Sequence, residues 1–112
     1  MKGKTMKVIN MTSNKGNKIA NQFIIENEIE DLHTEIYFQS YDSMIAKKVK
    51  KMTSDFDRSP IMQYEEKIYL DIKYWDYSVT TGKYRNIFLN ETKKETEKKI
   101  KDGIYTLTNL ND

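Results

Sequence analysis

His33 is the residue with the most obvious potential for acid–base or metal chemistry, because it is the only histidine in the chain. A zinc site or a general base needs partners, and the sequence holds no cysteine and no second histidine. Glu30, Asp31 and Glu35 lie near His33 in sequence, but an acidic cluster around one histidine is weak evidence for a metal. We interpret His33 as a surface or edge histidine, and we expect no metal and no cofactor.

Asp71 and Asp76 could act as two catalytic carboxylates, and they flank the single tryptophan, Trp75. Carboxylates held about 5–10 Å apart can hydrolyse glycosidic bonds. A chain of 112 residues leaves little room for a deep sugar-binding cleft. We therefore expect no catalytic residue and no enzymatic activity.

The segment TTGKYR, residues 80–85, is a candidate anion-binding site at the start of an expected helix. A helix N-terminus has free N–H groups and a partial positive charge, which attract anions. The hydroxyls of Thr80 and Thr81, with Lys83 and Arg85, would suit a phosphate or a carboxylate of a partner. The simpler interpretation, which we favour, is that the threonines cap the helix and Gly82 eases the turn.

Charged residues are arranged in blocks, although the net charge is only +2. The acidic block comprises Glu26, Glu28, Glu30 and Asp31. The later basic run comprises Lys47, Lys48, Lys50 and Lys51. Such blocks form either solvated faces, which is the more common case, or complementary patches for a charged partner.

Aromatic residues gather in the second half of the chain. They are Tyr64, Tyr69, Tyr74, Trp75 and Tyr77. Core packing explains most of them, but five such rings in a short span exceed the needs of one small core. Tyrosine and tryptophan are enriched in the hot spots of protein interfaces and can also stack on nucleic-acid bases. The excess therefore predicts a binding surface.

Composition indicates one small domain over residues 1–112, with 38% hydrophobic and 32% charged residues. No apolar run is long enough to span a membrane, and the basic N-terminus lacks the apolar segment of a signal peptide. The absence of cysteine excludes disulfides and fits a reducing cytoplasm. We expect a cytoplasmic protein, and the sequence leaves its oligomeric state open.

Hydrophobic periodicity and turn residues predict the elements. Strands are expected at 5–11, 19–26, 35–40, 44–49, 67–75 and 104–107, and helices at about 80–90 and 93–102. Residues 28–33 are expected as a helical turn or loop, and residues 50–63 as a loop. Leu70, Ile72, Ile87 and Phe88 should be buried together. The predicted fold class is α+β: a small antiparallel sheet, two short helices of the C-terminal half packed on one face, and a final strand.

Three stretches resemble a family of small proteins from phages and other mobile elements: FQSYDSMIAKK (38–48), YWDYSVTTGKYRNIFLNE (74–91) and KETEKKIKDGIYTLTNL (94–110). Members have a serine–tyrosine strand ending in IA and a YS-x-TT turn into a helix. Relative to the shorter members, residues 50–66 look like an inserted loop. The resemblance transfers no catalytic residue. It implies a bacterial host and a setting in which small proteins often disarm host defences, anti-CRISPR proteins among them.

These observations favour a non-enzymatic protein that binds and inhibits a host protein, such as a CRISPR effector, by steric occlusion of a nucleic-acid site. The acidic block and the aromatic residues Tyr69, Tyr74, Trp75 and Tyr77 are the expected contacts. The first alternative is a nucleic-acid-binding module that uses the basic run, the TTGKYR segment and the tyrosines. The second is a structural oligomer whose edge strands pair.

Overall fold

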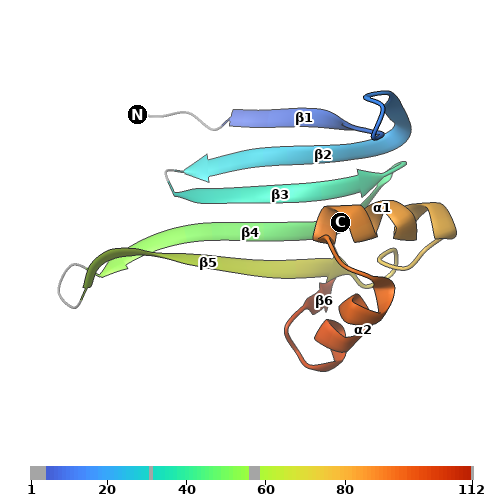
Figure 1. The fold of residues 1–112 in the computed structure, drawn as a ribbon. Coiled ribbons are helices and arrows are strands. Elements are labelled where there is room, and N and C mark those ends of the chain that lie inside the picture. The colour runs from blue at the N-terminus through green and yellow to red at the C-terminus, as the bar shows by residue number, and fades with distance from the viewer. Residues whose placement is uncertain (1–4, 31, 56–58, 112) are drawn as a thin grey trace.

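A meander of strands accounts for most of the chain in the computed structural model, which describes residues 5–30, 32–55 and 59–111, with only the backbone at 53–55 and 59–64. The strands are β1 (Thr5–Thr12), β2 (Lys18–Glu30), β3 (His33–Ser40), β4 (Ser43–Asp55), β5 (Ser59–Asp71) and β6 (Thr106–Thr108). They form one sheet in the order β1-β2-β3-β4-β5-β6 (Figure 1). The first five are antiparallel, whereas β6 runs parallel to β5. The predicted α+β class is confirmed, and the parallel β6 makes the sheet mixed.

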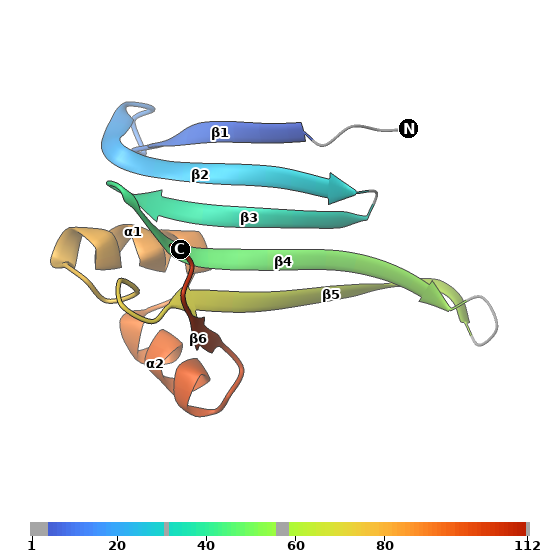
Figure 2. The ribbon, with the colours of Figure 1, turned by 180° about the vertical axis from the view of Figure 1, so that it is seen from behind.

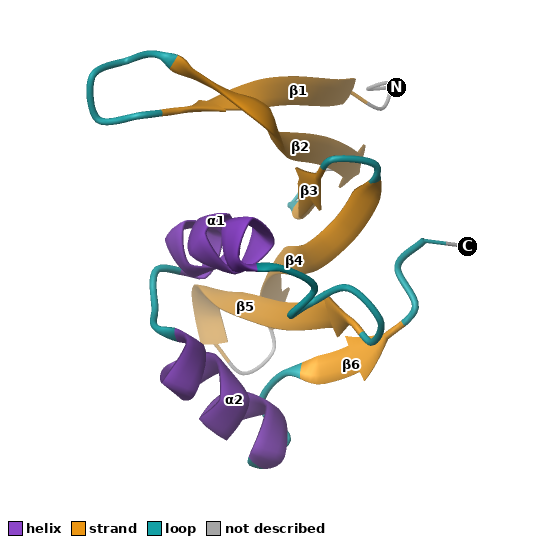
Figure 3. Cartoon of the chain, turned by 90° about the vertical axis from the view of Figure 1, so that its right-hand side faces the viewer, coloured by secondary structure: helices purple, strands orange, loops and turns teal. Residues whose placement is uncertain are grey.

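Helices α1 (Val79–Leu89) and α2 (Lys93–Lys101) follow β5 and lie on one side of the sheet (Figure 3). They provide the crossover that a parallel strand pair requires. The helix N-cap is Ser78, whose hydroxyl accepts a hydrogen bond from the N–H of Thr81, so neither threonine of TTGKYR caps α1 as expected. Thr92 and Glu95 form the predicted capping box of α2. None of the helices among the described residues is long and apolar enough to cross a membrane.

The core lies where α1 covers the centre of the sheet. Register places Ile24, Phe38, Ala46 and Leu70 in one row across β2 to β5, on the side that we call the helix face. Phe38, Ala46 and Leu70 are fully buried there, and Phe88 of α1 packs on them. The opposite side, the open face, carries alternate residues of the same strands and is crossed by the segment after β6 (Figure 2).

The prediction that Leu70, Ile72, Ile87 and Phe88 are buried together is confirmed for two of the four residues. Leu70 and Phe88 are buried as predicted, but Ile72 and Ile87 are 62% and 56% exposed. β5 ends at Asp71 rather than at Trp75, which removes Ile72 from the strand period. Ile87 lies on the side of α1 that faces away from the sheet.

Two segments expected as loops belong to strands. Glu28–Glu30 continue β2, and His33 begins β3 after a turn in which Leu32 has a φ of 66°. Lys50–Gln63 was expected to be a loop, but its described residues extend β4 and β5 into a long hairpin, paired from Lys50↔Glu66 to Ser54↔Met62. Residues 56–58 lie outside the described part. Polar residues and Pro60 outnumber the apolar residues of this hairpin, so its sequence indicated a loop, although Met52 and Tyr64 pair across it.

A buried carboxylate docks α2 against the rest of the chain. Glu91, in the connection between the helices, accepts hydrogen bonds from the hydroxyls of Tyr105 (2.7 Å) and Thr96 (2.6 Å), and Lys99 Nζ lies 2.7 Å from it. Burial and the hydrogen bond to Glu91 raise the pKa of Tyr105 to about 12. Burial would raise the pKa of Glu91, but Lys99 and the two hydroxyls lower it below its ordinary value.

Candidate functional site

The connection between β5 and α1, residues 72–78, carries Tyr74, Trp75 and Tyr77, three of the five aromatic residues that the sequence singled out. Asp71, 1% exposed, anchors its start, because Asp71 Oδ2 accepts from the N–H groups of Lys73 (3.0 Å) and Tyr74 (2.8 Å). Asp71 Oδ1 accepts from the N–H of Leu110 (2.8 Å) and the amide of Asn111 (2.9 Å). Burial would raise the pKa of Asp71, but these four hydrogen bonds hold it below its ordinary value. Both oxygens of the Asp71 carboxylate therefore accept hydrogen bonds that hold the chain in place.

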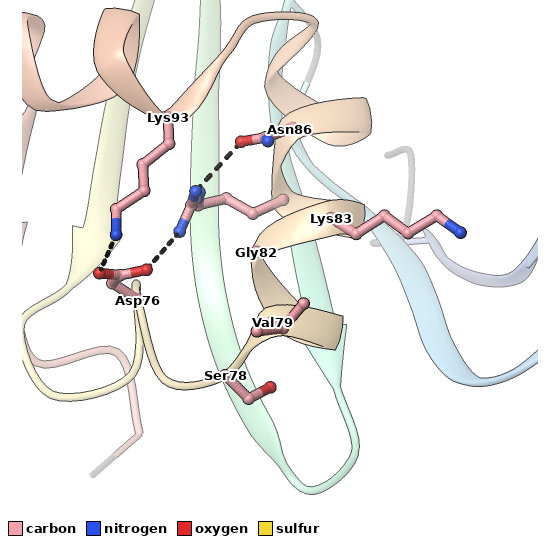
Figure 4. Close-up of a pocket in the computed structure, with 8 residues that line it drawn as sticks. Asp76, Ser78, Val79, Gly82, Lys83, Asn86 and Lys93 are labelled. Carbon is pink, nitrogen blue, oxygen red and sulfur yellow. Dashed lines mark hydrogen bonds and ion pairs between the residues drawn. The ribbon is translucent and has the colours of Figure 1, made fainter.

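Arg85 of α1 holds the second half of this connection in place through Trp75 and Asp76. Its guanidinium is 1% exposed; Nη1 donates to the carbonyl of Trp75 (2.6 Å) and lies 3.5 Å from Asp76 Oδ1. The guanidinium carbon lies 5.1 Å from the centre of the Trp75 ring. Lys93 of α2 reaches the other oxygen of Asp76 at 2.9 Å (Figure 4). Asp76 is therefore held between two cations, Arg85 and Lys93.

The expected anion site at TTGKYR does not assemble. Thr81 is buried, and its hydroxyl shares a hydrogen bond of 3.0 Å with Ser40 of β3. The guanidinium of Arg85 binds the connection between β5 and α1, whereas Lys83 points away from Asp76 into solvent (Figure 4). Thr80 is exposed. The favoured interpretation, in which these threonines cap the helix, is also wrong, because Ser78 is the N-cap of α1.

Tyr41, Tyr74 and Tyr77 gather where β3 ends and α1 begins, and Val79 is the first residue of α1; we call these four residues the tyrosine surface. The rings of Tyr74 and Tyr77 meet edge to face, with centroids 5.5 Å apart. Tyr77 is 67% and Val79 92% exposed. Tyr41, Tyr74 and Tyr77 line a hollow of about 650 Å³ together with Asp42 and Ser78. Tyr41, Tyr77 and Val79 are exposed at this end of the molecule, whereas Tyr74 packs partly against the core.

Tyr41 is the residue of this surface that sequence reasoning missed. It sits in the turn between β3 and β4 with a φ of 56°, and it is 48% exposed. Glycine, asparagine and aspartate adopt this conformation readily, whereas a tyrosine is strained in it. The signal was the short segment SYDS, in which a large aromatic residue occupies a tight turn.

Tyr69 and Trp75 are not part of the tyrosine surface. Trp75 is half-buried against Arg85. Tyr69 lies on the open face, where Lys47 Nζ is 5.8 Å from its ring and 5.4 Å from that of Tyr37. The side chain of Tyr64 lies outside the described residues. Of the four aromatic contacts expected from sequence, the structure brings together Tyr74 and Tyr77.

Most of the acidic block lies at the other end of β3 from the tyrosine surface. Glu28 and Glu30 pair with Thr34 and His33 at the start of β3, and Glu26 pairs with Ile36 in its middle, whereas Tyr41 follows its last residue. Eight residues of β3 span about 23 Å, at roughly 3.3 Å per residue. Asp31 falls outside the described residues. The acidic block and the tyrosines therefore form no single surface.

The basic run is largely engaged within the protein. Lys47 Nζ lies 3.2 Å from Glu35, and Lys50 Nζ 3.8 Å from Glu66. Lys48 donates to the carbonyl of Phe88 (2.7 Å), and burial lowers its pKa. Only Lys51 is exposed among the four. Lys47 and Lys51 line one hollow beside Tyr69 on the open face, and Lys48 and Lys50 are not among its lining residues.

His33 lies at the edge of this charged network. Its Nε2 is 3.4 Å from Glu35, which also binds Lys47 and accepts a hydrogen bond from Tyr37 (3.1 Å). Burial would raise the pKa of Glu35, but Lys47 and Tyr37 lower it. Within residues 5–30, 32–55 and 59–111, no group of three histidine or acidic side chains is arranged to hold a metal ion.

Comparison with known proteins decides the family. The model of a family of unknown function, DUF8033, matches residues 6–103, which is more than half of the chain. The chain belongs to this family. The DUF8033 match includes the whole tyrosine surface and Arg85, and it ends before β6. No curated protein matches the chain. No solved structure matches it either.

Proposed function

We propose that this DUF8033 protein acts by binding a partner protein, without catalysis, and that the tyrosine surface makes the contact. The observation that carries the proposal is Tyr41, a half-exposed tyrosine with a φ of 56°. Strained backbone of this kind costs on the order of 1–3 kcal/mol and clusters at functional sites. The turn alone would favour asparagine or glycine, so a tyrosine at this position supports a role for its side chain.

The chemistry of the surface favours a protein over a nucleic acid. Tyr41, Tyr77 and Val79 offer apolar area with phenol hydroxyls at its rim, which is typical of interface hot spots. A nucleic-acid site needs cations aligned along a phosphate backbone. Lys47, Lys48 and Arg85, which the alternative requires, are bound to groups of the protein itself.

The resemblance to small phage and mobile-element proteins directs the choice of partner. A host defence protein, such as a CRISPR effector, is the first partner to test, with inhibition by occupation of its nucleic-acid site. The proposed contact differs from the one expected from sequence, because Glu30 of the acidic block is about 23 Å away along β3. Inhibition would rely on apolar contact and shape.

The experiment is a pull-down from bacterial host lysate, with the full chain as bait and with or without nuclease. Tyr77→Ala and Tyr41→Asn should each lose the captured protein, because both remove ring area from the surface. Ile104→Ala is the matched control, since Ile104 is 62% exposed but lies outside the tyrosine surface. Circular dichroism verifies that all three variants fold.

Three outcomes separate the hypotheses. A nuclease-resistant partner that is lost with Tyr77→Ala and kept with Ile104→Ala supports the proposal. Partners that all disappear with nuclease support the nucleic-acid alternative. A partner retained by both tyrosine variants excludes the tyrosine surface as its binding site.

A further inference from the structure

The outer edge of β1 is open. β1 is the first strand in the sheet order, and in the part of the chain that the structure describes it pairs with β2 alone (Figure 1). Its outward N–H and C=O groups are therefore unpaired with any strand. Thr5–Thr12 contains one charged residue, Lys7, and no proline. Met6 and Val8 are 69% and 59% exposed.

The opposite edge of the sheet is protected by comparison. β6 pairs with the last three residues of β5, and the stretch before them carries the exposed charges Glu65, Glu66 and Lys67. Pro60, at the second position of β5, has no N–H to offer. Charge, proline and short edge strands are the usual means of preventing edge-to-edge pairing. β1 has almost none of them, which marks its edge as a place where another strand binds.

We propose that β1 pairs antiparallel with β1 of a second copy of this chain, in a register centred on Val8. Val8 then lies opposite Val8 of the second copy, Lys7 opposite Ile9, Met6 opposite Asn10 and Thr5 opposite Met11. The two sheets become one continuous sheet across the junction. The contact is independent of the tyrosine surface, which lies at the β3–β4 turn.

Self-complementarity of β1 selects a second copy as the occupant. Within the chain, Val8 pairs with Ile25 of β2 on the open face. The proposed register therefore creates a row of four β-branched residues, Ile25–Val8–Val8–Ile25, across the junction. Cross-strand pairs of β-branched side chains stabilise antiparallel sheets.

Charge and turn geometry exclude the neighbouring registers. Centring the pair on Lys7 would place two lysines directly opposite each other, which is destabilising. Centring it on Ile9 would place Thr5 opposite Ser13, which lies in the turn after β1. A shift of the register by one residue would place the open face of one copy on the same side as the helix face of the other. The Val8 register pairs the seven residues from Thr5 to Met11, six of which, Thr5 to Asn10, also pair regularly with β2.

Single cysteines test the register directly, because the natural chain has no cysteine. In the Val8 register the two Val8 Cβ atoms lie about 4.5–5.5 Å apart. Val8→Cys should therefore form a disulfide-linked dimer under mild oxidation. Met6→Cys is the matched control, since Met6 is more exposed on the same face but lies four residues, or about 13 Å, from its own counterpart. A mixture of Met6→Cys and Asn10→Cys should again form a linked dimer.

Sedimentation of the natural chain gives the second readout. It should show a concentration-dependent change from one chain to two, and Val8→Lys should abolish the dimer while circular dichroism stays unchanged. Equal disulfide formation by Val8→Cys and Met6→Cys would indicate random collision and overturn the proposal. A chain that remains monomeric at every concentration, or a dimer that survives Val8→Lys, would also overturn it.

Discussion

The ring of Phe38 on β3 stacks against the ring of Phe88 on α1, with centroids 5.8 Å apart and an angle of 29° between the planes. Lys48 Nζ of β4 lies 4.4 Å from the centroid of the Phe88 ring, and it donates a hydrogen bond to the carbonyl of Phe88. This contact joins the helix to the two central strands of the meander. It is the point at which loss of one side chain should separate α1 from the sheet.

Phe88→Ala should lower the free energy of unfolding by about 3–5 kcal/mol, because it leaves a cavity beneath α1. Ile87→Ala, one position away and 56% exposed, should change it by less than about 0.5 kcal/mol. Chemical denaturation of the two variants measures the difference. Equal effects would show that α1 does not bury the face described here.

Arg85→Met should release the connection that carries Tyr74 and Tyr77. The carbonyl of Trp75 would lose its charged donor, for which we expect a loss of about 2–3 kcal/mol, while Asp76 retains Lys93. Emission of the single tryptophan should shift to longer wavelength as Trp75 becomes more exposed to water. Lys83→Met, at an exposed position of the same helix, should change neither quantity.

Asp71→Asn should lower stability at neutral pH by about 2–4 kcal/mol, since it weakens charge-assisted hydrogen bonds to a buried carboxylate. The pKa of Asp71 is lower in the folded chain than its ordinary value of 3.8. Its stabilisation is therefore fully present above about pH 4 and is lost as the pH falls toward the lower folded value. Unfolding curves between pH 7 and pH 2 should show a shallower decline for the variant.

The control for the acid profile is Asp42→Asn. Asp42 is exposed and makes no hydrogen bond or ion pair within the described residues, so its substitution should leave the profile unchanged. If the stability of Asp71→Asn falls with decreasing pH as steeply as that of the natural chain, the acid sensitivity belongs to other carboxylates. Glu35 and Glu91 also have lowered pKa values.

Tyr41→Asn should stabilise the fold by about 1 kcal/mol, because asparagine accepts the left-handed backbone that strains tyrosine. The same substitution should weaken binding to the partner. Thermal unfolding and pull-down of one preparation give both readouts. A loss of stability would show that the ring of Tyr41 serves the fold, which would remove the main support for the tyrosine surface.

Gln22→Met should leave stability unchanged or raise it. Gln22 is fully buried, and its amide has no hydrogen-bond partner among the described residues. Replacing an unsatisfied buried amide with an apolar group of similar shape removes a desolvation penalty. Ser40→Ala, which breaks the buried hydrogen bond to Thr81, should instead cost about 1 kcal/mol. Denaturant titration compares the two.

Local patterns in the sequence predicted most elements, because strand alternation and caps act over a few residues. The Thr92–Glu95 capping box and the left-handed Gly103, with a φ of 77°, are examples. The hairpin beyond Lys50 was missed because its many polar residues and Pro60 indicate a loop, and the pairing of Met52 with Tyr64 is evident only in the structure. The end of β5 at Asp71 depends on hydrogen bonds to Leu110 and Asn111, which are distant in sequence.

The site was harder to predict, because the meander reorders residues in space. The acidic block and the basic run are separate in sequence, yet antiparallel pairing brings Glu28, Thr34 and Lys50 into one row. Tyr41 and Tyr77 are far apart in sequence but line the same hollow. The expected single surface of acids and aromatics therefore did not form. Side-chain type could suggest candidates, but strand register decided which of them meet.

Each of the first five strands pairs with the next one along the chain, and only β6 must return past both helices to reach β5. Short loops close at little entropic cost, so the hairpins can assemble one after another before the C-terminal third docks. Tyr74 and Tyr77 meet Tyr41 only when α1 has settled on Phe38. A partially folded chain would thus possess a sheet but no tyrosine surface, so the ability to bind would be the last property acquired during folding.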